Sequence, residues 1–280
     1  MIGYGATELR ALWGGVAVKS WKVFLSYKVW FISDIGMGFL FVGQALLIGL
    51  GLTGKRNSEA LQRLTGYSDY VAFAVLGLLI LSFGLTFLSG FVWSVVDELY
   101  TGTLEYSFAA PPMRRITFFL GNVLVRLFLS LLYMAIYLPP FFKLLFGLGI
   151  NLLAVLKALP VLLLGSLGMV GLGMVAAGIV LYLRDPGPFI SILEMLVFAL
   201  SGAMYPPLSI LPRALQALAK ALPPYAPTTE ALRKVVVYGY GSSTGELWYL
   251  AVISILYSVL GYLVYKWSEK QARIVGLKSY

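Results

Sequence analysis

The stretch Tyr70–Val96, YVAFAVLGLLILSFGLTFLSGFVWSVV, decides the fold class of this chain. It contains no charged residue and is dominated by Leu, Val, Phe and Gly. A helix needs about 20 apolar residues to cross about 30 Å of hydrocarbon. The stretch therefore predicts a membrane-spanning helix.

The composition agrees with a membrane protein. Of 280 residues, 60% are hydrophobic and 12% charged, whereas a soluble domain has roughly 25% charged residues. The chain has no Cys and no His, which excludes disulfides, thiolate metal sites and a histidine general base. The formal charge of +9 favours contact with anionic lipid headgroups. No pattern indicates nucleic-acid binding, and none predicts a metal site.

Six stretches are long and apolar enough, or nearly so, to be spans. They are Val29–Leu52, Tyr70–Val96, Ile116–Leu138, Ala158–Leu183, Phe189–Tyr205 and Leu247–Trp267. We expect an all-α polytopic membrane protein in a single domain over residues 1–280. Residues 1–28 mix aromatic residues with lysines, which predicts a helix in the membrane interface.

An even number of spans places both termini on one side of the membrane. Lys and Arg are divided almost evenly between the two sides, so the positive-inside rule favours cytoplasmic termini only weakly. The segment Gly49–Arg56, GLGLTGKR, nearly matches a phosphate-binding loop, but Arg56 stands where Ser or Thr should hold Mg²⁺. The segment also ends a span instead of linking a strand to a helix. We interpret it as a glycine-rich helix end.

Two connections between spans are long. Residues 97–115, DELYTGTLEYSFAAPPMRR, combine acidic residues, a Gly-Thr pair, two prolines and two arginines. Residues 206–245 contain leucines at helical spacing, closed by Pro223–Pro224, which predicts a short amphipathic helix. A second short helix is expected to begin at Thr228 or Thr229, with Glu230 in its first turn.

Motifs along nearly the whole chain resemble the membrane subunits of type-2 ABC exporters. The motifs are Glu98 with Gly102-Thr103-Leu104-Glu105, Pro111-Pro112 and Arg114-Arg115, then Arg184-Asp185, Ser201-Gly202, Tyr205-Pro206, Leu211-Pro212, Pro223-Pro224 and Glu230-Ala231-Leu232-Arg233. The chain departs from the family pattern in its doubled prolines and its glycine-heavy fourth span.

The resemblance implies six spans, an interfacial N-terminal helix, a cytoplasmic coupling helix within 97–115 and external re-entrant helices within 206–245. It also implies a multi-pass protein of the cell membrane with both termini cytoplasmic. Family members bind no nucleotide, so ATP and Mg²⁺ would be held by partner ATPase subunits. The usual complex has two ATPases and two permeases, the second being another copy or a homologue.

The coupling helix of the family docks in a cleft of the ATPase. Here Asp97, Glu98 and Glu105 could supply charged contacts, and Leu104 and Phe108 an apolar plug. Gly102 and Thr103 belong to the motif itself. Pro111 would end the element sharply before the arginines.

Three ionisable residues, Asp34, Arg126 and Glu194, fall inside predicted spans. Such charges are costly and usually face protein or water. Counting residues from the span ends places all three at similar depth, so we expect Arg126 to pair with Glu194 and to have Asp34 as a further partner. The pair could lock helices together or contact substrate, and Asp34 could instead reach the interface.

Aromatic and glycine patterns point to helix packing. Phe83, Phe87 and Phe91 recur every four residues and share a face. With Met195 and Phe198 they could line an apolar route at a dimer interface, although an aromatic-rich membrane bundle favours ordinary packing or lipid contact. The glycines of the fourth span predict close helix approach; they are Gly165, Gly168, Gly171, Gly173 and Gly178.

The sequence thus predicts the permease of an ATP-driven exporter of a lipophilic drug, peptide or lipid, with no catalytic residue of its own. A lipid-linked glycan is an alternative cargo, since the chain has 18 Tyr. An ion-coupled transporter or channel would need no ATPase and would use the intramembrane charges as ion sites. A membrane-embedded enzyme would need clustered acids, and the spacing of the acids forms no such cluster.

Overall fold

The fold is known from a computed structural model. It describes residues 59–102, 121–129, 152–183, 187–203, 208–221 and 224–275, with isolated residues between 18 and 57 and between 119 and 136. The elements of this part of the chain are helices, and an isolated bridge joins Asn57 to Asp69.

Three long apolar helices confirm the predicted second, fourth and sixth spans. They are α5 (Tyr70–Tyr100), α8 (Leu152–Leu183) and α12 (Thr244–Val275). Each contains a segment long and apolar enough to cross a membrane. Helix α5 continues past Val96, so Asp97 and Glu98 belong to its last turn and not to the loop that follows.

The predicted fifth span is shorter than expected. Helix α9 (Gly187–Leu200) ends before Tyr205, and at 1.5 Å per residue it is only about 21 Å long. The chain turns at Gly202, whose φ of 61° lies in the left-handed region that favours glycine. Helix α9 therefore does not cross the hydrocarbon by itself.

The connection before the last span folds into two helices, as expected. Between short 3₁₀ turns η2 (Leu208–Ile210) and η3 (Tyr240–Ser242) lie α10 (Arg213–Ala221) and α11 (Tyr225–Tyr238). Helix α11 begins earlier than predicted, because Pro224 is its N-cap and Pro227 is tolerated in its first turn. Glu230 is therefore not a first-turn acid.

The described residues of the predicted first and third spans are helical, as are those of the N-terminal segment 1–28. The full extent of these three elements lies outside the described residues. A short helix, α4 (Glu59–Thr65), precedes α5.

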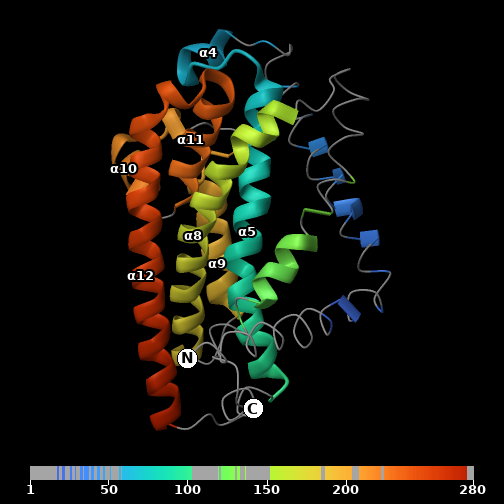
Figure 1. Cartoon of the computed structure of the whole chain (residues 1–280), viewed down its shortest axis with the longest axis vertical. Coiled ribbons are helices and arrows are strands. Elements are labelled where there is room, and N and C mark those ends of the chain that lie inside the picture. The colour runs from blue at the N-terminus through green and yellow to red at the C-terminus, as the bar shows by residue number, and fades with distance from the viewer. Residues whose placement is uncertain are drawn as a thin grey trace, which may run out of the picture.

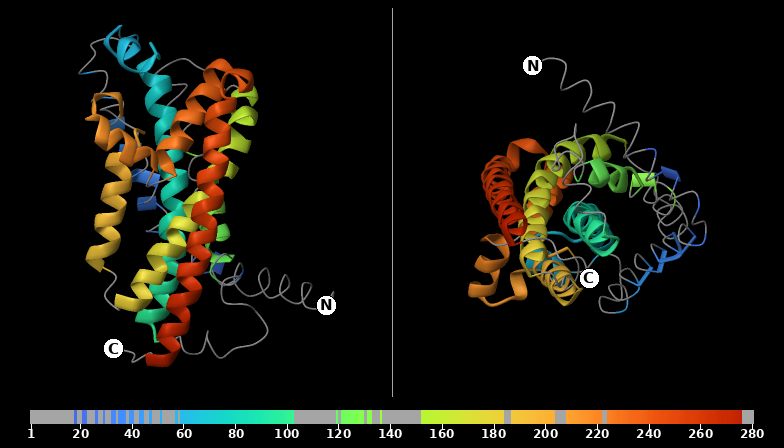
Figure 2. Two further views of the ribbon diagram at one scale, coloured as in Figure 1. Left: turned by 90° about the vertical axis from the view of Figure 1, so that its left-hand side faces the viewer. Right: turned by 90° about the horizontal axis from the view of Figure 1, so that it is seen from below.

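The long helices form a bundle with α8 between α5 and α12 (Figures 1 and 2). Helices α4, α10 and α11 gather at one end, where α11 packs against both α8 and α5. The last turns of α5, α8 and α12 lie at the opposite end. The segment after α5 and the segment containing α10 and α11 therefore emerge at opposite ends of the bundle.

Glycines of α8 allow these close approaches, as the sequence predicted. A Cβ on Gly171 would lie 2.3 Å from the carbonyl oxygen of Tyr257 in α12, and one on Gly173 would lie 2.9 Å from that of Leu88 in α5. Gly261 of α12 faces Gly171: a Cβ on Gly261 would lie 2.2 Å from the carbonyl oxygen of Gly171. Inside lipid the hydrophobic effect does not favour helix association, so close backbone packing at glycines stabilises the helix pairs instead.

We expect Gly171→Ala to separate α8 from α12, because the new methyl group would overlap backbone atoms that have no room to move. Overpacking of this kind costs about 1–3 kcal/mol, which lowers the Tm measured in detergent by several degrees. Gly245→Ala is the matched control, since a Cβ at that position of α12 meets nothing within 4 Å. An unchanged Tm for Gly171→Ala would contradict this crossing.

Candidate functional site

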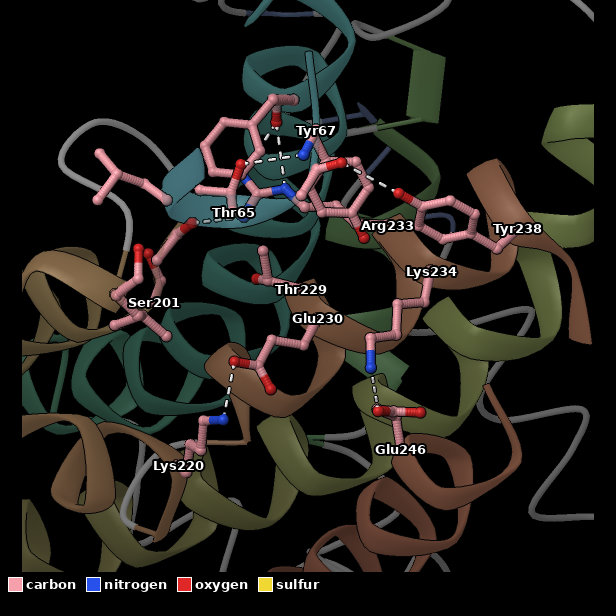
Figure 3. Close-up of a pocket in the computed structure, with 16 residues that line it drawn as sticks. Thr65, Tyr67, Ser201, Lys220, Thr229, Glu230, Arg233, Lys234, Tyr238 and Glu246 are labelled. Atoms are coloured by element: carbon pink, nitrogen blue, oxygen red, sulfur yellow. Dashed lines mark hydrogen bonds and ion pairs between the residues drawn. The ribbon is translucent and has the colours of Figure 1, made fainter. Parts of the chain in front are cut away.

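A buried arginine organises the end of the bundle where α10 and α11 gather. Arg233 of α11 is 5% exposed. Its Nε and Nη2 donate to the carbonyl oxygen of Phe73, at 3.3 and 2.9 Å. Its Nη1 and Nη2 also donate, at 2.7 Å each, to the carbonyls of Gly202 and Ala203. One side chain thus joins α11 to the start of α5 and to the turn after α9 (Figure 3).

The guanidinium carries its charge in this buried position. Its carbon lies 3.4 Å from the centre of the Phe73 ring, a geometry that favours a cation. Burial lowers the pKa of Arg233 to about 9, against the opposing effect of Tyr67, Glu230 and Tyr70. The group is therefore protonated at neutral pH, and its hydrogen bonds are charge-assisted.

The local sequence explains why the carbonyls are available to Arg233. Ser201 accepts a hydrogen bond from the amide of Ala203 at 3.1 Å and donates to the carbonyl of Phe198 at 2.9 Å. The turn then passes directly over Gly77 of α5, where a Cβ would lie 1.7 Å from the Ala203 oxygen. Only glycine permits this approach.

A pocket of about 450 Å³ lies beside Arg233. It is lined by residues of α4, α5, η2, α10, α11 and α12, and by the turns before α5 and after α9. Two ion pairs lie on one side of it, one of Lys220 with Glu230 at 3.1 Å and one of Lys234 with Glu246. Figure 3 shows both pairs below Arg233 in that view, with Thr229 above Glu230.

Aromatic side chains close the pocket on the side of α4. Tyr238 donates to the carbonyl of Gly66 at 3.1 Å, and its ring centroid lies 5.9 Å from that of Tyr67. Burial raises the pKa of Tyr67 to about 12, so its phenol is neutral across the physiological range. The pocket therefore combines rings, hydroxyls and paired charges.

Sequence reasoning did not single out this site. Arg233 entered only as part of the Glu-Ala-x-Arg motif, and Ser201-Gly202 only as a motif after the fifth span. The available signal was an arginine in a short segment that is otherwise apolar towards the core, with Ala231, Leu232 and Val235 around it. A buried arginine needs acceptors, but the sequence could not show that backbone carbonyls supply them.

At the other end of the bundle, Arg126 forms an ion pair with Asp97 of α5, at 3.2 Å. The prediction that Arg126 pairs with Glu194 is therefore wrong. Arg126 starts near Gly90, where a Cβ would lie 3.3 Å from its Cδ, and its long side chain extends along α5 to the last turn. Long basic side chains commonly reach towards the interface in this way. Asp34, the other expected partner, lies outside the described residues.

The expected coupling residues divide into two groups. Thr103, Leu104, Glu105, Phe108 and Pro111 lie outside the described residues. Asp97 and Glu98 lie in the last turn of α5, and Glu98 is only 9% exposed. Gly102, with a φ of 68°, turns the chain out of the helix.

The five residues expected to line an apolar route are not brought to one surface. Phe83, Phe87 and Phe91 are buried; the first two rings lie 5.2 Å apart, and Phe91 packs on Tyr265 at 5.5 Å. The packing interpretation therefore holds for the three phenylalanines. Met195 and Phe198 of α9 are instead 76% and 42% exposed.

In the part of the chain that the structure describes, no group of three Asp or Glu side chains could hold a metal ion. A family model, described as ABC-2 type transporter, matches residues 8–237. The chain belongs to this family. Among curated proteins, none matches it.

Membership of the ABC-2 type transporter family makes the chain a membrane-embedded permease component of an ABC transporter, and it implies association with ABC ATPase subunits. The match begins in the N-terminal segment and ends in α11, so it includes Arg233, the turn after α9 and the segment after α5. Both ends of the bundle described above therefore belong to the region that defines the family.

We expect Arg233→Met to destabilise this ABC-2 permease severely. The change removes the donor of the turn carbonyls of Gly202 and Ala203, and each unsatisfied buried acceptor costs about 1–3 kcal/mol. Arg213→Met is the matched control, because Arg213 opens α10 at an exposed position. Thermal unfolding in detergent compares the two. Equal Tm values for both variants would show that Arg233 does not hold the segments together.

Proposed function

We propose that this chain is the permease of an exporter, which moves a lipophilic drug, peptide or lipid outward by alternating access. A separate ATPase drives the cycle and holds the ATP and Mg²⁺. It would act on the segment 97–115 at the cytoplasmic end, with the cap of α10 and α11 facing outward. The complex would contain two ATPases and a second permease, and would lie in the cell membrane.

The ion pair between Asp97 and Arg126 at the end of α5, called the joint below, supports this proposal most directly. The segment that would bind the ATPase is flanked by α5 and by the helical residues 121–129, and the ion pair between Asp97 and Arg126 links the two. Ring contact between Phe91 of α5 and Phe119, with centroids 5.9 Å apart, adds a second contact two residues before that helical stretch. A displacement of the segment would therefore move both helices together.

The length of α5 adds to the argument. Its last turn includes Asp97, and the hydroxyl of Thr101 donates to the Asp97 carbonyl at 2.7 Å. Because the helix continues into the flanking segment without a break, a force applied there passes along a rigid element. Helix α5 packs on α8 and α11, so the same element connects the proposed ATPase end with the cap.

Helix α9 supports the proposal of a second permease. Met195, Leu196 and Ile192 are exposed on it, beside the half-buried carboxyl group of Glu194. A carboxylate at this depth is costly against lipid but tolerated against protein. We therefore assign this face of α9 to the contact with the second permease.

The role of the joint is tested with Asp97→Asn and Arg126→Gln in the permease reconstituted with its ATPase subunit. A half-exposed ion pair contributes only about 0–1 kcal/mol to stability, so each variant should keep its Tm within a few degrees. We expect ATP hydrolysis by the assembled complex to lose its dependence on the permease. The charge exchange Asp97→Arg with Arg126→Asp should restore it.

The matched control is Arg63→Gln, which breaks an exposed pair with Glu59 on α4, far from the joint. Normal coupling in both single variants would overturn the role of the joint. Failure of the ATPase to co-purify with the unmodified chain would instead overturn the assignment of the partner.

The absence of cysteine from the chain allows a direct test of the second permease. Met195→Cys should give a cross-linked dimer with a short bifunctional thiol reagent in native membranes, because the new thiol would lie within reach of its counterpart on a second copy of the chain. Leu256→Cys is the control, since Leu256 is also exposed but lies on α12. Equal cross-linking of the two variants, or none at position 195, would contradict this interface.

A further inference from the structure

Two tryptophans mark the membrane boundaries on α12. Trp248 is 75% exposed and Trp267 is 54% exposed. At 1.5 Å per residue they lie about 28 Å apart along the helix, which matches the hydrocarbon thickness of about 30 Å. Tryptophan side chains favour the level of the headgroups at both interfaces. We infer that the hydrocarbon spans the stretch of α12 between them.

The surface between the two tryptophans agrees with this placement. The large exposed side chains there are apolar apart from Tyr249, Tyr262 and Lys266, each of which lies within five residues of one of the tryptophans. The apolar ones are Val252, Ile255, Leu256, Val259, Leu260 and Leu263. Tyr182 of α8 lies at the level of Trp267, with ring centroids 5.9 Å apart. A lipid-facing stripe bounded by aromatic rings at both ends is the pattern of a spanning helix.

This placement sets the level of the pocket beside Arg233. Glu246 lies in the first turn of α12, just beyond Trp248 on the side away from the hydrocarbon. The headgroup layer on each side of a bilayer is about 5–7 Å thick, which is several residues of helix. The pocket therefore opens at the level of lipid headgroups.

The charges of the pocket have an uncommon arrangement. Lys220, Arg233 and Lys234 are its cations, and Glu230 and Glu246 are its carboxylates. Each lysine is already paired with a carboxylate, and the four charged side chains of these pairs remain partly exposed. Arg233 has five N–H donors, and its four hydrogen bonds to described carbonyls use four of them.

We propose that this pocket binds the headgroup of a zwitterionic phospholipid, with its phosphate towards the lysines and the remaining N–H of Arg233, and its ammonium towards Glu230 and Glu246. A simple anion that approached a lysine would also meet that lysine's carboxylate. A headgroup with both charges can exchange partners with an existing ion pair, so that no charge is left unpaired. The site stands whatever the exporter's cargo is.

The rest of the lining suits the part of a phospholipid next to its headgroup. Leu64, Leu208 and Phe73 supply apolar surface, while Thr65, Ser209 and Thr229 supply hydroxyl groups. Ester groups and the first methylenes of the acyl chains need this mixture of surfaces. The volume of about 450 Å³ lies within the range of ligand pockets, about 300–1,000 Å³.

The test uses the purified full chain in detergent, titrated with dihexanoyl phosphatidylethanolamine. Binding to the folded protein stabilises it by RT ln(1 + c/Kd), where c is the free lipid concentration, and so raises its Tm as c increases. A fit of this rise gives an apparent Kd. We expect Lys220→Gln with Glu230→Gln to weaken binding at least about tenfold, because a charge-assisted contact is lost at each end of the headgroup. Lys234→Gln with Glu246→Gln should do the same.

Neither double variant changes the net charge. The control is Glu59→Gln with Arg63→Gln, which removes an exposed ion pair of the same kind on α4. Each variant's Tm without lipid reports whether it folds, and the lipid affinity of either folded pocket variant alone tests the proposal. Unchanged affinity in a folded pocket variant overturns the proposal.

Three further probes distinguish what is recognised. Dihexanoyl phosphatidylglycerol carries the phosphate without the ammonium, phosphoethanolamine carries the headgroup without acyl chains, and dihexanoylglycerol carries the chains alone. We expect each to bind at least about tenfold more weakly. Equal binding of the first would show an anion site, of the second a site for a free phosphoester, and of the third an apolar site, and each result overturns a lipid-headgroup pocket.

Discussion

The hydrogen bonds of Arg233 to backbone carbonyls are the constraint on which the upper end of the bundle depends. A buried charge is costly unless it is hydrogen-bonded or paired, and here three carbonyls from α5 and the turn after α9 accept four of the five N–H groups of Arg233. The same bonds explain why α9 is short. Its last carbonyls and those of the turn would otherwise be unsatisfied at a helix end, and Arg233 satisfies two of them while Ser201 braces the turn.

Close approach at glycines carries this constraint into the bundle. Gly77 lets the turn lie directly on α5, Gly84 leaves room for the ring of Tyr225, and Gly165 leaves room for Thr228. Helix α11 can therefore sink into the groove between α5 and α8 instead of lying on the surface. In this position α11 contacts α5, α8 and α12. A displacement at either end of α5 would therefore also move the cap and α8.

The apolar windows predicted the long helices, and the glycine run predicted the packing of α8, because both signals act locally along the chain. The ends of elements were harder. Helix α5 continues to Tyr100 since its last turn gains tertiary contacts that a hydropathy window does not register. The partner of Arg126 was misassigned because depth was counted at the backbone, whereas the side chain reaches along α5 to Asp97. Arg233 escaped notice because its acceptors are carbonyls, which every sequence contains.

The two charged joints differ in a way that bears on mechanism. Arg233 is buried and hydrogen-bonded to backbone, so breaking these bonds would leave a buried charge and the two turn carbonyls unsatisfied, at a cost of several kcal/mol. Asp97 and Arg126 are half exposed, so water can replace each partner at a cost of about 1 kcal/mol or less. Under the proposed cycle, the joint beside the ATPase can therefore break and re-form at each turnover, whereas the cap must move as a unit with α5. Movement of the ATPase at the Asp97–Arg126 end would therefore displace α5 and the cap together. The outward face would open by a shift of whole helices, not by unfolding of the cap.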